Sequence, residues 1–364
     1  MFKSGFWGLL IALVVNSVIS SGSVYADNGG HSDSITAKEY REMVDKAIDY
    51  LRKEGQDEEG AFSPQLGPGV TALVTSSLIQ NGISVDDPAV TKGLKYVERF
   101  VQQDGGIYSD GSKHRNYETS LAIVCFADAN QGGRYDETLR NAESFLRTMQ
   151  WGVGFKAAES DDAYGGAGYG KHERPDMSNT GFFIEALHKV GNGADDEGVQ
   201  RALKFFSRCQ NLESEHNKTK FADKVKDGGF YYTVAAGGES KAGETPNGGL
   251  RSYGSMTYVG LKSMIYAGLT KEDKRVIAAT DWIKKFYTLK TNPGVGNQGL
   301  FYYYCTLAKA FDVLGDDVLI DSKGVKHIWR AELATELHSR QQKDGSWLNE
   351  GASRWMEGDK NLVT

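Results

Sequence analysis

The segment Arg174–Phe183, RPDMSNTGFF, combines the residue types that chemistry most often needs. Asp176 supplies a carboxylate, Ser178 a hydroxyl and Asn179 an amide, and an apolar run follows Thr180. A carboxylate can serve as a general acid or base, but Asp, Ser or Asn before a helix can also cap its free N–H groups. The sequence leaves three interpretations open: an enzyme site, a site that lacks its working acid, or the start of a helix.

Two long loops rich in glycine, tyrosine and charge precede the apolar runs after Thr180 and Thr257. They contain SDDAYGGAGYGKHERPD and DGGFYYTVAAGGESKAGETPNGGLRSYGS. If the following helices are parallel, both loops lie over one mouth, where helix N-termini favour an anionic or polar group. Ligand-binding candidates near this mouth are Tyr169, His172, Arg174, Asp176, Arg251 and Tyr253. The alternative is that the loops pack on themselves and Arg174 pairs with Asp176.

An internal repeat indicates how these residues are positioned. Pentapeptides that end in threonine precede apolar segments of about eleven residues, and the repeat threonines are Thr71, Thr119, Thr180, Thr257 and, at the end of the chain, Thr364. A helix that is apolar on all sides is buried, and Thr, Ser or Asn before it can cap it. The segment YCTLAKAFDVLG fits the same frame with Tyr304 in place of the threonine.

Amphipathic segments alternate with these apolar ones. They are approximately Ala37–Lys53, Ala89–Gln102, Tyr135–Met149, Asp196–Cys209, Lys271–Leu289 and Val325–Gln341. Between the two kinds lies a glutamine or acidic residue, then glycine, then an aromatic or apolar residue, as in QDEEGAF, QQDGGIY, QWGVGF, KDGGFYY and QQKDGSW. Glycine permits a tight turn, and an aromatic ring can pack between neighbours. The pattern predicts outer helix, turn and inner helix, repeated about six times and stabilised by stacking.

These turns resemble the QW-type repeats of the squalene cyclase and protein prenyltransferase families, and the chain resembles an exported, bacterial-type member. The resemblance implies an all-α (α/α)₆ toroid with a central cavity, forming a single domain over residues 37–364. The sixth inner helix is apparently missing, because the sequence ends at Thr364, where that helix would begin. We therefore expect that the sequence is clipped or that the ring is left open.

The resemblance also bears on the motif at Asp176. Squalene-hopene-type cyclases carry a DxDDTA motif whose middle aspartic acid protonates an alkene or epoxide, which requires a strong acid held protonated. Here the aligned string is Asp176-Met177-Ser178-Asn179-Thr180-Gly181, with Ser178 at the proton donor and Asn179 at the next aspartate. The resemblance therefore implies that this cyclisation is absent. The similar string ESDD, residues 159–162, lies in a loop out of register with the inner helix.

Metal chemistry and disulfides are not predicted. Protein prenyltransferases bind zinc through Asp, Cys and His, but no cysteine lies near Asp176 and no histidine within residues 253–257. We therefore expect no metal and no cofactor. Cys125, Cys209 and Cys305 are an odd set at wide spacing, which is no disulfide framework. A bridge between Cys125 and Cys305 is possible in principle.

One charged group follows from the repeat register. Glu185, Lys262 and Lys309 each lie five residues past the register position of their own inner helix. They should therefore lie at equal depth inside the ring. Because buried charges are seldom left unpaired, the simpler interpretation is an ion pair between Glu185 and Lys262. The functional interpretation is a polar lumen that holds a ligand's head group.

Composition and the N-terminus set the remaining limits. The chain has 364 residues and a formal charge of −6 without a basic tract, so a nucleic-acid partner is not expected. Residues 1–26 read as a signal peptide, with Lys3, an apolar run over 6–19 and small residues before cleavage at Ala26. Residues 27–36 form a short linker. The mature chain is expected to be periplasmic or secreted, without a transmembrane segment.

Three functions from different classes remain open. The first is binding of an isoprenoid or other lipid in an aromatic-lined cavity. The second is a polysaccharide lyase or hydrolase that uses a tyrosine or arginine of the mouth loops, and the third is a scaffold for protein partners that the sequence does not identify. The ring could also be filled by its own side chains, including Phe182, Phe183, Tyr302 and Tyr303.

Overall fold

The computed structural model describes residues 34–153, 155–171, 173–349 and 358–364. The predicted signal peptide and most of the predicted linker lie outside the described residues, as does His172. At the end of the linker, Thr36 caps the first described helix through a reciprocal pair of hydrogen bonds with Glu39. Among the described residues, no helix has both the length and the apolar character needed to span a bilayer.

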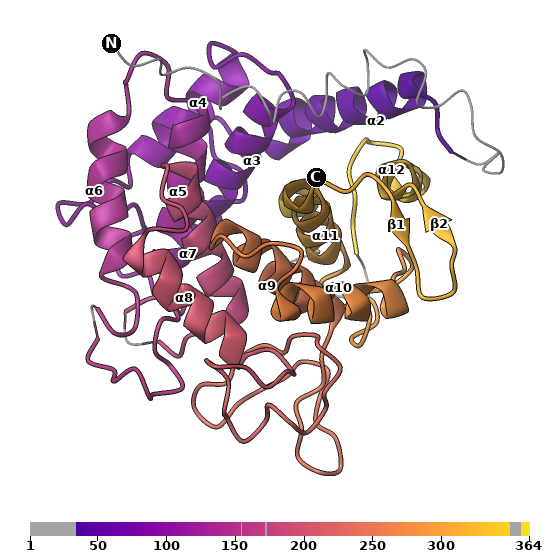
Figure 1. The fold of residues 1–364 in the computed structure, drawn as a ribbon. Coiled ribbons are helices and arrows are strands. Elements are labelled where there is room, and N and C mark those ends of the chain that lie inside the picture. The colour runs from indigo at the N-terminus through magenta and orange to yellow at the C-terminus, as the bar shows by residue number, and fades with distance from the viewer. Residues whose placement is uncertain (1–33, 154, 172, 350–357) are drawn as a thin grey trace, which may run out of the picture.

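The inner layer is a ring of helices that follow one another around a common axis (Figure 1). Its members are α3 (Pro68–Gln80), α5 (Arg115–Asp128), α7 (Met177–Lys189), α9 (Gly254–Tyr266) and α11 (Leu300–Leu314). Each packs against the next in this order, and the short α13 (Lys360–Val363) lies against α3. All the long inner helices have little polar surface because one side meets the outer layer and the flanks meet inner neighbours.

The outer layer consists of amphipathic helices that surround the inner ring (Figure 1). They are α2 (Ala37–Tyr50), extended by the π-helical turn η1 (Leu51–Gly55), then α4 (Pro88–Glu98), α6 (Asp136–Arg147), α8 (Glu197–Arg208), α10 (Lys274–Phe286) and α12 (Trp329–Arg340). Helix α12 packs against α2, so the first and last outer helices are neighbours. The described chain is therefore an all-α toroid of alternating outer and inner helices.

Short elements occur between the helices. A 3₁₀ turn, η2 (Pro64–Leu66), precedes α3, and an antiparallel hairpin of β1 (Leu319–Ile320) and β2 (Lys326–His327) precedes α12. The hairpin occupies the start of the predicted outer helix at Val325, which was therefore placed too early. The sequence DSKG at residues 321–324 forms the turn of this hairpin, with Gly324 at a φ of 82°.

The glutamines of the turns connect neighbouring outer helices. Gln150 donates through Nε2 to the carbonyl oxygens of Gly165, at 2.9 Å, and of Gly198 in α8, at 2.8 Å. Gln56, Gln210 and Gln341 make the same two bonds, to the glycine of their own turn and to α4, α10 and α2 respectively. The predicted turn QWGVGF was partly wrong, because Gln150 pairs with Gly165 rather than with a glycine beside it in sequence.

Glycine is needed in these turns because the turn lies directly on the next outer helix. Gly165 has a φ of 84°, and a Cβ there would lie 1.9 Å from the backbone oxygen of Arg201 in α8. The same approach to the next outer helix, at 2.3–2.7 Å, recurs at Gly60, Gly105, Gly228 and Gly345. Both the backbone angle and the absent side chain are therefore required.

The repeat threonines fix the turn to the inner helix instead of capping it, which corrects the prediction. Thr180 lies within the first turn of α7, where its hydroxyl accepts the N–H of Ala167 at 3.0 Å and donates to the carbonyl of Asp176 at 2.7 Å. Thr71, Thr119 and Thr257 likewise accept from the turn residues Phe62, Ile107 and Phe230. Thr364 accepts from Trp347 in the same way, at 3.3 Å.

Candidate functional site

Contacts between inner helices that are not neighbours identify the side chains that face the axis. Helices α7 and α11 are separated by α9 in the ring. Nevertheless, Ser178 of α7 and Tyr302 of α11 share a hydrogen bond of 3.0 Å between their hydroxyl groups. The rings of Phe182 and Tyr302 also meet, with centroids 6.3 Å apart. These side chains can only meet across the inside of the ring.

An aromatic group lines the axis below the mouth. Tyr117 of α5 contacts Phe182 edge-on at 5.1 Å and lies 6.4 Å from Tyr169, which is 39% exposed at the mouth. We call Tyr117, Tyr169, Phe182 and Tyr302 the axial aromatic group. Its three helical members are half-buried, so part of the surface of each is not covered by other side chains at this depth.

Of the four aromatics that the sequence offered as possible fillers of the ring, only two face the axis. Phe182 and Tyr302 face the axis, whereas Phe183 and Tyr303 are completely buried. Tyr303 packs edge-on against Tyr258 and donates to the carbonyl of Thr288, which follows outer helix α10. Phe183 and Tyr303 are therefore part of the wall between the two layers.

Asp176 is the N-cap of α7 and is 2% exposed. Its Oδ1 accepts the backbone N–H of Asn179 at 2.9 Å, and its Oδ2 accepts the side-chain amide of Asn179 at 2.8 Å. The hydroxyl of Tyr232, from the loop before α9, bonds to the same carboxyl group. Burial raises the pKa of Asp176 to about 6, although the hydrogen bonds from Asn179 and Tyr232 oppose the rise.

We predict that Asp176→Asn becomes more favourable to stability as the pH rises. The folded-state pKa of Asp176 lies above the ordinary value of 3.8, so ionising this carboxyl destabilises the folded chain. The destabilisation is fully present above pH 6 and declines as the pH falls toward 4. Asparagine retains the cap but carries no charge. In urea unfolding, the stability of the variant relative to the native chain should be about 1–2 kcal/mol more favourable at pH 8 than at pH 5. A difference independent of pH would contradict this account.

The other two positions of the motif carry no acid. The hydroxyl of Ser178 shares a hydrogen bond with the hydroxyl of Tyr302, and the side-chain nitrogen of Asn179 donates a hydrogen bond to Asp176. The side-chain oxygen Oδ1 of Asn179 is buried and has no hydrogen-bond partner within the described part of the chain. The ESDD string lies on the outer layer, where Glu159 pairs with Lys204 of α8 at 2.5 Å. Asp176 serves as the N-cap of α7 and as a hydrogen-bond acceptor, which agrees with the interpretation that this segment is the start of a helix.

Charges at the mouth pair differently from the prediction. Arg174 binds Glu239 at 2.7 Å rather than Asp176, and Lys241 pairs with the same glutamate. Both cations also lie over the ring of Tyr232, at 5.9 Å for Arg174 and 4.6 Å for Lys241. Arg174 could not be paired correctly from sequence because its partner lies in the other mouth loop, 65 residues away.

The two remaining mouth candidates are separated by the structure. Tyr253 is 4% exposed, and burial, together with the nearby Tyr302 and Asp176, raises its pKa well above the ordinary range. Arg251 instead donates to the carbonyl of Glu244 within its own loop, at 3.2 Å. It lines a surface groove of about 220 Å³ formed with residues of outer helix α10, including Trp282 and Phe286. Arg251 is therefore held within its own loop, beside outer helix α10.

The predicted charge cluster forms and includes all three residues. Lys262 binds Oε2 of Glu185 at 2.5 Å, and Lys309 binds Oε1 of the same carboxylate. Burial alone would raise the pKa of Glu185, but the two ammonium charges lower it well below its usual range. Burial lowers the pKa of Lys262, and the attraction of Glu185 only partly offsets this effect. Glu185 therefore carries a charge shared by two lysines.

A second polar layer lies one turn deeper and was missed. Lys189 pairs with Oδ1 of Asp128, while Ser76 and Gln80 donate to Oδ2 at 2.5 and 2.7 Å. Gln80, Asp128 and Lys189 each lie nine residues past the repeat threonine of their helix. The register that found the first cluster would therefore have found this one as well.

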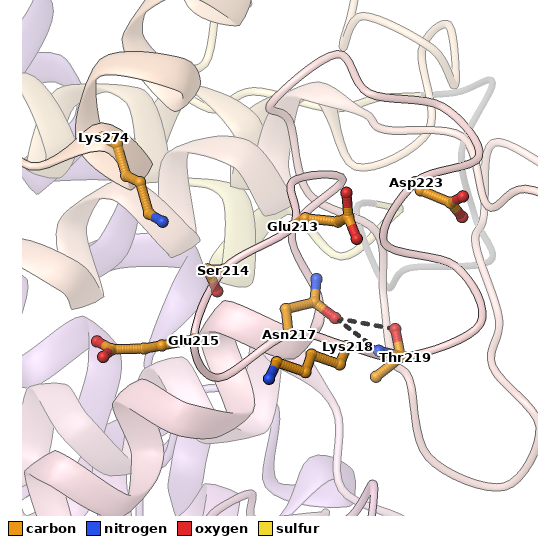
Figure 2. A pocket seen from close by; sticks show the side chains of 8 residues that line it. All are labelled: Glu213, Ser214, Glu215, Asn217, Lys218, Thr219, Asp223 and Lys274. Carbon is orange, nitrogen blue, oxygen red and sulfur yellow. Dashed lines mark hydrogen bonds between the residues drawn. The ribbon is translucent and has the colours of Figure 1, made fainter.

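A surface hollow beside outer helix α10 does not belong to the axis. It has a volume of about 490 Å³ and is lined by Glu213, Ser214, Glu215, Asn217, Lys218, Thr219, Asp223 and Lys274 (Figure 2). These residues come from one loop and from the start of outer helix α10. Asn217 is used inside the loop, where it donates to the carbonyls of Gln210 and Leu212 and accepts from Thr219.

Comparison with known proteins identifies the fold. No family model and no curated protein matches the sequence. Among solved structures, the chain is similar to the type II terpene cyclase MstE from Scytonema (TM-score 0.53, 14% identity, covering 86% of this chain and 82% of that one). A variant of MstE in complex with geranylgeranyl dihydroxybenzoate, its substrate, gives a TM-score of 0.50, 14% identity and coverage of 85% and 81%.

Candida albicans protein geranylgeranyltransferase-I complexed with GGPP is a more distant match, with a TM-score of 0.44, 12% identity and coverage of 91% of this chain and 96% of that one. At such identities a structural likeness concerns the fold and not the chemistry. With the alternating helix order, the comparisons show that this chain has the α/α toroid fold of type II terpene cyclases.

Proposed function

We propose that this protein binds an isoprenoid, or a lipid of similar shape, along the axis of its inner ring. The observation that carries the proposal is the axial aromatic group. Its helical members, Tyr117, Phe182 and Tyr302, meet across the ring yet remain half-buried, whereas the wall aromatics are completely buried. Half-buried rings that face inward provide an apolar surface for a ligand to cover.

The structural neighbours support this class of ligand. The MstE variant of similar fold was solved with a geranylgeranyl compound as substrate. An isoprenoid chain is long, apolar and branched, which suits contact with several aromatic rings on different helices. The proposal for this chain is limited to binding, because the positions that align with the cyclase acid are Ser178 and Asn179.

The alternative of a polysaccharide lyase is less well supported. Such an enzyme would need a base at the mouth, and the tyrosines there are poor candidates. Burial raises the pKa of Tyr232 far above the ordinary value, and burial also raises the pKa of Tyr169. A tyrosine with a raised pKa is not deprotonated near neutral pH, so neither residue is suited to remove a proton from a sugar.

The binding proposal predicts that Phe182→Ala weakens binding of geranylgeraniol by about tenfold or more. The variant removes a ring whose burial by a ligand is worth about 1.5–3 kcal/mol. Binding can be measured by titration calorimetry or by native mass spectrometry. The matched control is Phe286→Ala, since Phe286 is 39% exposed on outer helix α10. The proposal fails if the native chain does not bind the alcohol, or if both variants weaken binding equally.

We also propose that the protein is exported. The support is the order of one lysine, an apolar run and small residues within residues 1–26. Expression of the full chain in a bacterial host should give a mature protein that begins at Asp27 and fractionates outside the cytoplasm. N-terminal sequencing and intact mass would establish both points. An unprocessed chain that stays in the cytoplasm would refute this proposal.

A further inference from the structure

The charged cluster on the axis has more positive than negative groups. Lys262 and Lys309 share Glu185, and one turn deeper Lys189 is matched by Asp128. The two polar layers together thus contain three lysines and two carboxylates. The nearby His188 is held neutral near pH 7, because burial lowers its pKa. The layer therefore retains an excess of one positive charge.

Lys262 has fewer hydrogen-bond acceptors than its charge requires. Its side chain is only 4% exposed, and an ammonium group has three N–H donors. Glu185 is the acceptor that the described residues provide, and the ring of Tyr266 lies 5.7 Å from the ammonium nitrogen. A buried cation gains from a second acceptor because water is largely excluded.

Lys309 makes this layer accessible. Its side chain is 43% exposed although its ammonium group is bound to Glu185. Lys309 and Tyr302 are seven residues apart on α11, so they lie on one face about 10 Å apart along the helix. On α7, Glu185 likewise follows Phe182 toward the deeper end. A chain in contact with the aromatic rings would therefore place its end at the lysines.

The mouth is less suited to an anion. Arg174 and Lys241 already share Glu239, and the carboxyl group of Asp176 lies beside Tyr232 just behind them. A negatively charged group at the mouth would meet carboxylates whose cations are in use. An anionic end is thus better accommodated at the deeper layer than at the helix N-termini.

We propose that the ligand is an isoprenoid carboxylate whose single negative charge lies between Lys309 and Lys262, with its chain on the axial aromatic group. This inference rests on the proposed function and adds the chemistry and the direction of the ligand. A carboxylate matches the excess of one positive charge and supplies the acceptor that Lys262 lacks. No bond is made or broken.

The test compares geranylgeranoic acid with geranylgeraniol, which have the same chain. The native protein should bind the acid at least tenfold more tightly at pH 7.5. Lys309→Gln should remove most of this preference, because it should weaken binding of the acid far more than binding of the alcohol. The control is Lys271→Gln, which makes the same charge change at an exposed lysine paired with Asp316. Equal binding of acid and alcohol would overturn the inference and leave the proposed function intact; binding of neither would overturn both.

A thiol reports where the acid binds. Cys305 is exposed and lies between Tyr302 and Lys309 on the same face of α11, while Cys125 and Cys209 are buried and all three are free. The bridge between Cys125 and Cys305, which the sequence left possible without supporting it, is not formed. Bound acid should slow alkylation of Cys305 at least severalfold, in proportion to occupancy. Tight binding of the acid without protection of Cys305 would show that the head group lies elsewhere and would overturn the placement.

Discussion

Glu185→Gln is expected to lower the free energy of unfolding by about 3–5 kcal/mol at pH 7. Removing one partner of a buried ion pair leaves the other charge uncompensated, which costs far more than losing a surface pair. Here the side chain of Lys262 is 4% exposed and that of Glu185 15% exposed, so water replaces the lost carboxylate beside Lys262 only in small part. Urea unfolding at pH 7 measures the loss.

The pH dependence gives a second readout of the same prediction. The folded-state pKa of Glu185 lies below its ordinary value of 4.5, so the folded chain binds fewer protons than the unfolded chain in acid. The stability from this group is fully present above about pH 5 and is lost as the pH falls. The gap between native and variant should therefore shrink from pH 6 to pH 3.

A double variant provides the control. Glu185→Gln with Lys262→Met removes both buried charges and replaces the ammonium with an apolar chain of similar length. Such replacements are often neutral or stabilising, so the double variant should recover most of the lost stability. A single Glu185→Gln variant within 1 kcal/mol of the native chain would contradict a buried, shared carboxylate.

Gly165→Ala should be the most damaging single-methyl change in the turns, with a loss of more than about 3 kcal/mol or no folded protein. Two costs act together: a left-handed backbone, worth about 1–3 kcal/mol for a residue other than glycine, and a collision with the backbone oxygen of Arg201 at 1.9 Å. Because that oxygen belongs to α8, relief would require the turn and the outer helix to separate.

Gly191→Ala separates these two costs. Gly191 has a φ of 98°, but a Cβ there would have nothing within 4 Å. This variant should lose only the backbone part, about 1 kcal/mol. Soluble yield and urea midpoints of the two variants give the comparison. If both alanines cost the same, the close approach to Arg201 is not what requires glycine.

The parts of the fold that repeat could be predicted from sequence, because each repeat solves the same packing problem. The repeat threonines fell into register since each one holds an equivalent turn, and the register placed Glu185, Lys262 and Lys309 at one depth. The same reasoning would have placed Asp128 and Lys189. The sequence therefore contains the information that places Asp128 and Lys189, although the prediction did not include them.

The mouth loops could not be predicted, because nothing in them is periodic. Arg251 and Arg174 were both assigned to the mouth, yet one binds within its own loop and the other pairs across loops. Tyr232 was missed for the same reason, since its partner Asp176 lies at the start of a different helix. In the third repeat, several glycines could have formed the turn according to the sequence. Only the packing against α8 in the structure identifies Gly165 as the one that does.

The glutamine bonds of the turns have a consequence for the chain as a whole. These glutamines join α2 to α4, α6 to α8 and α8 to α10. Gln341 adds a bond from the end of α12 to Met43 in α2, 298 residues earlier. An open stack of repeats has two free ends from which it can fray. Here the first and last outer helices hold each other. If a protease cut one mouth loop, the two fragments would still be in contact at two places. One is between the helices on either side of the cut, and the other is between α12 and α2. We therefore expect the fragments to stay associated.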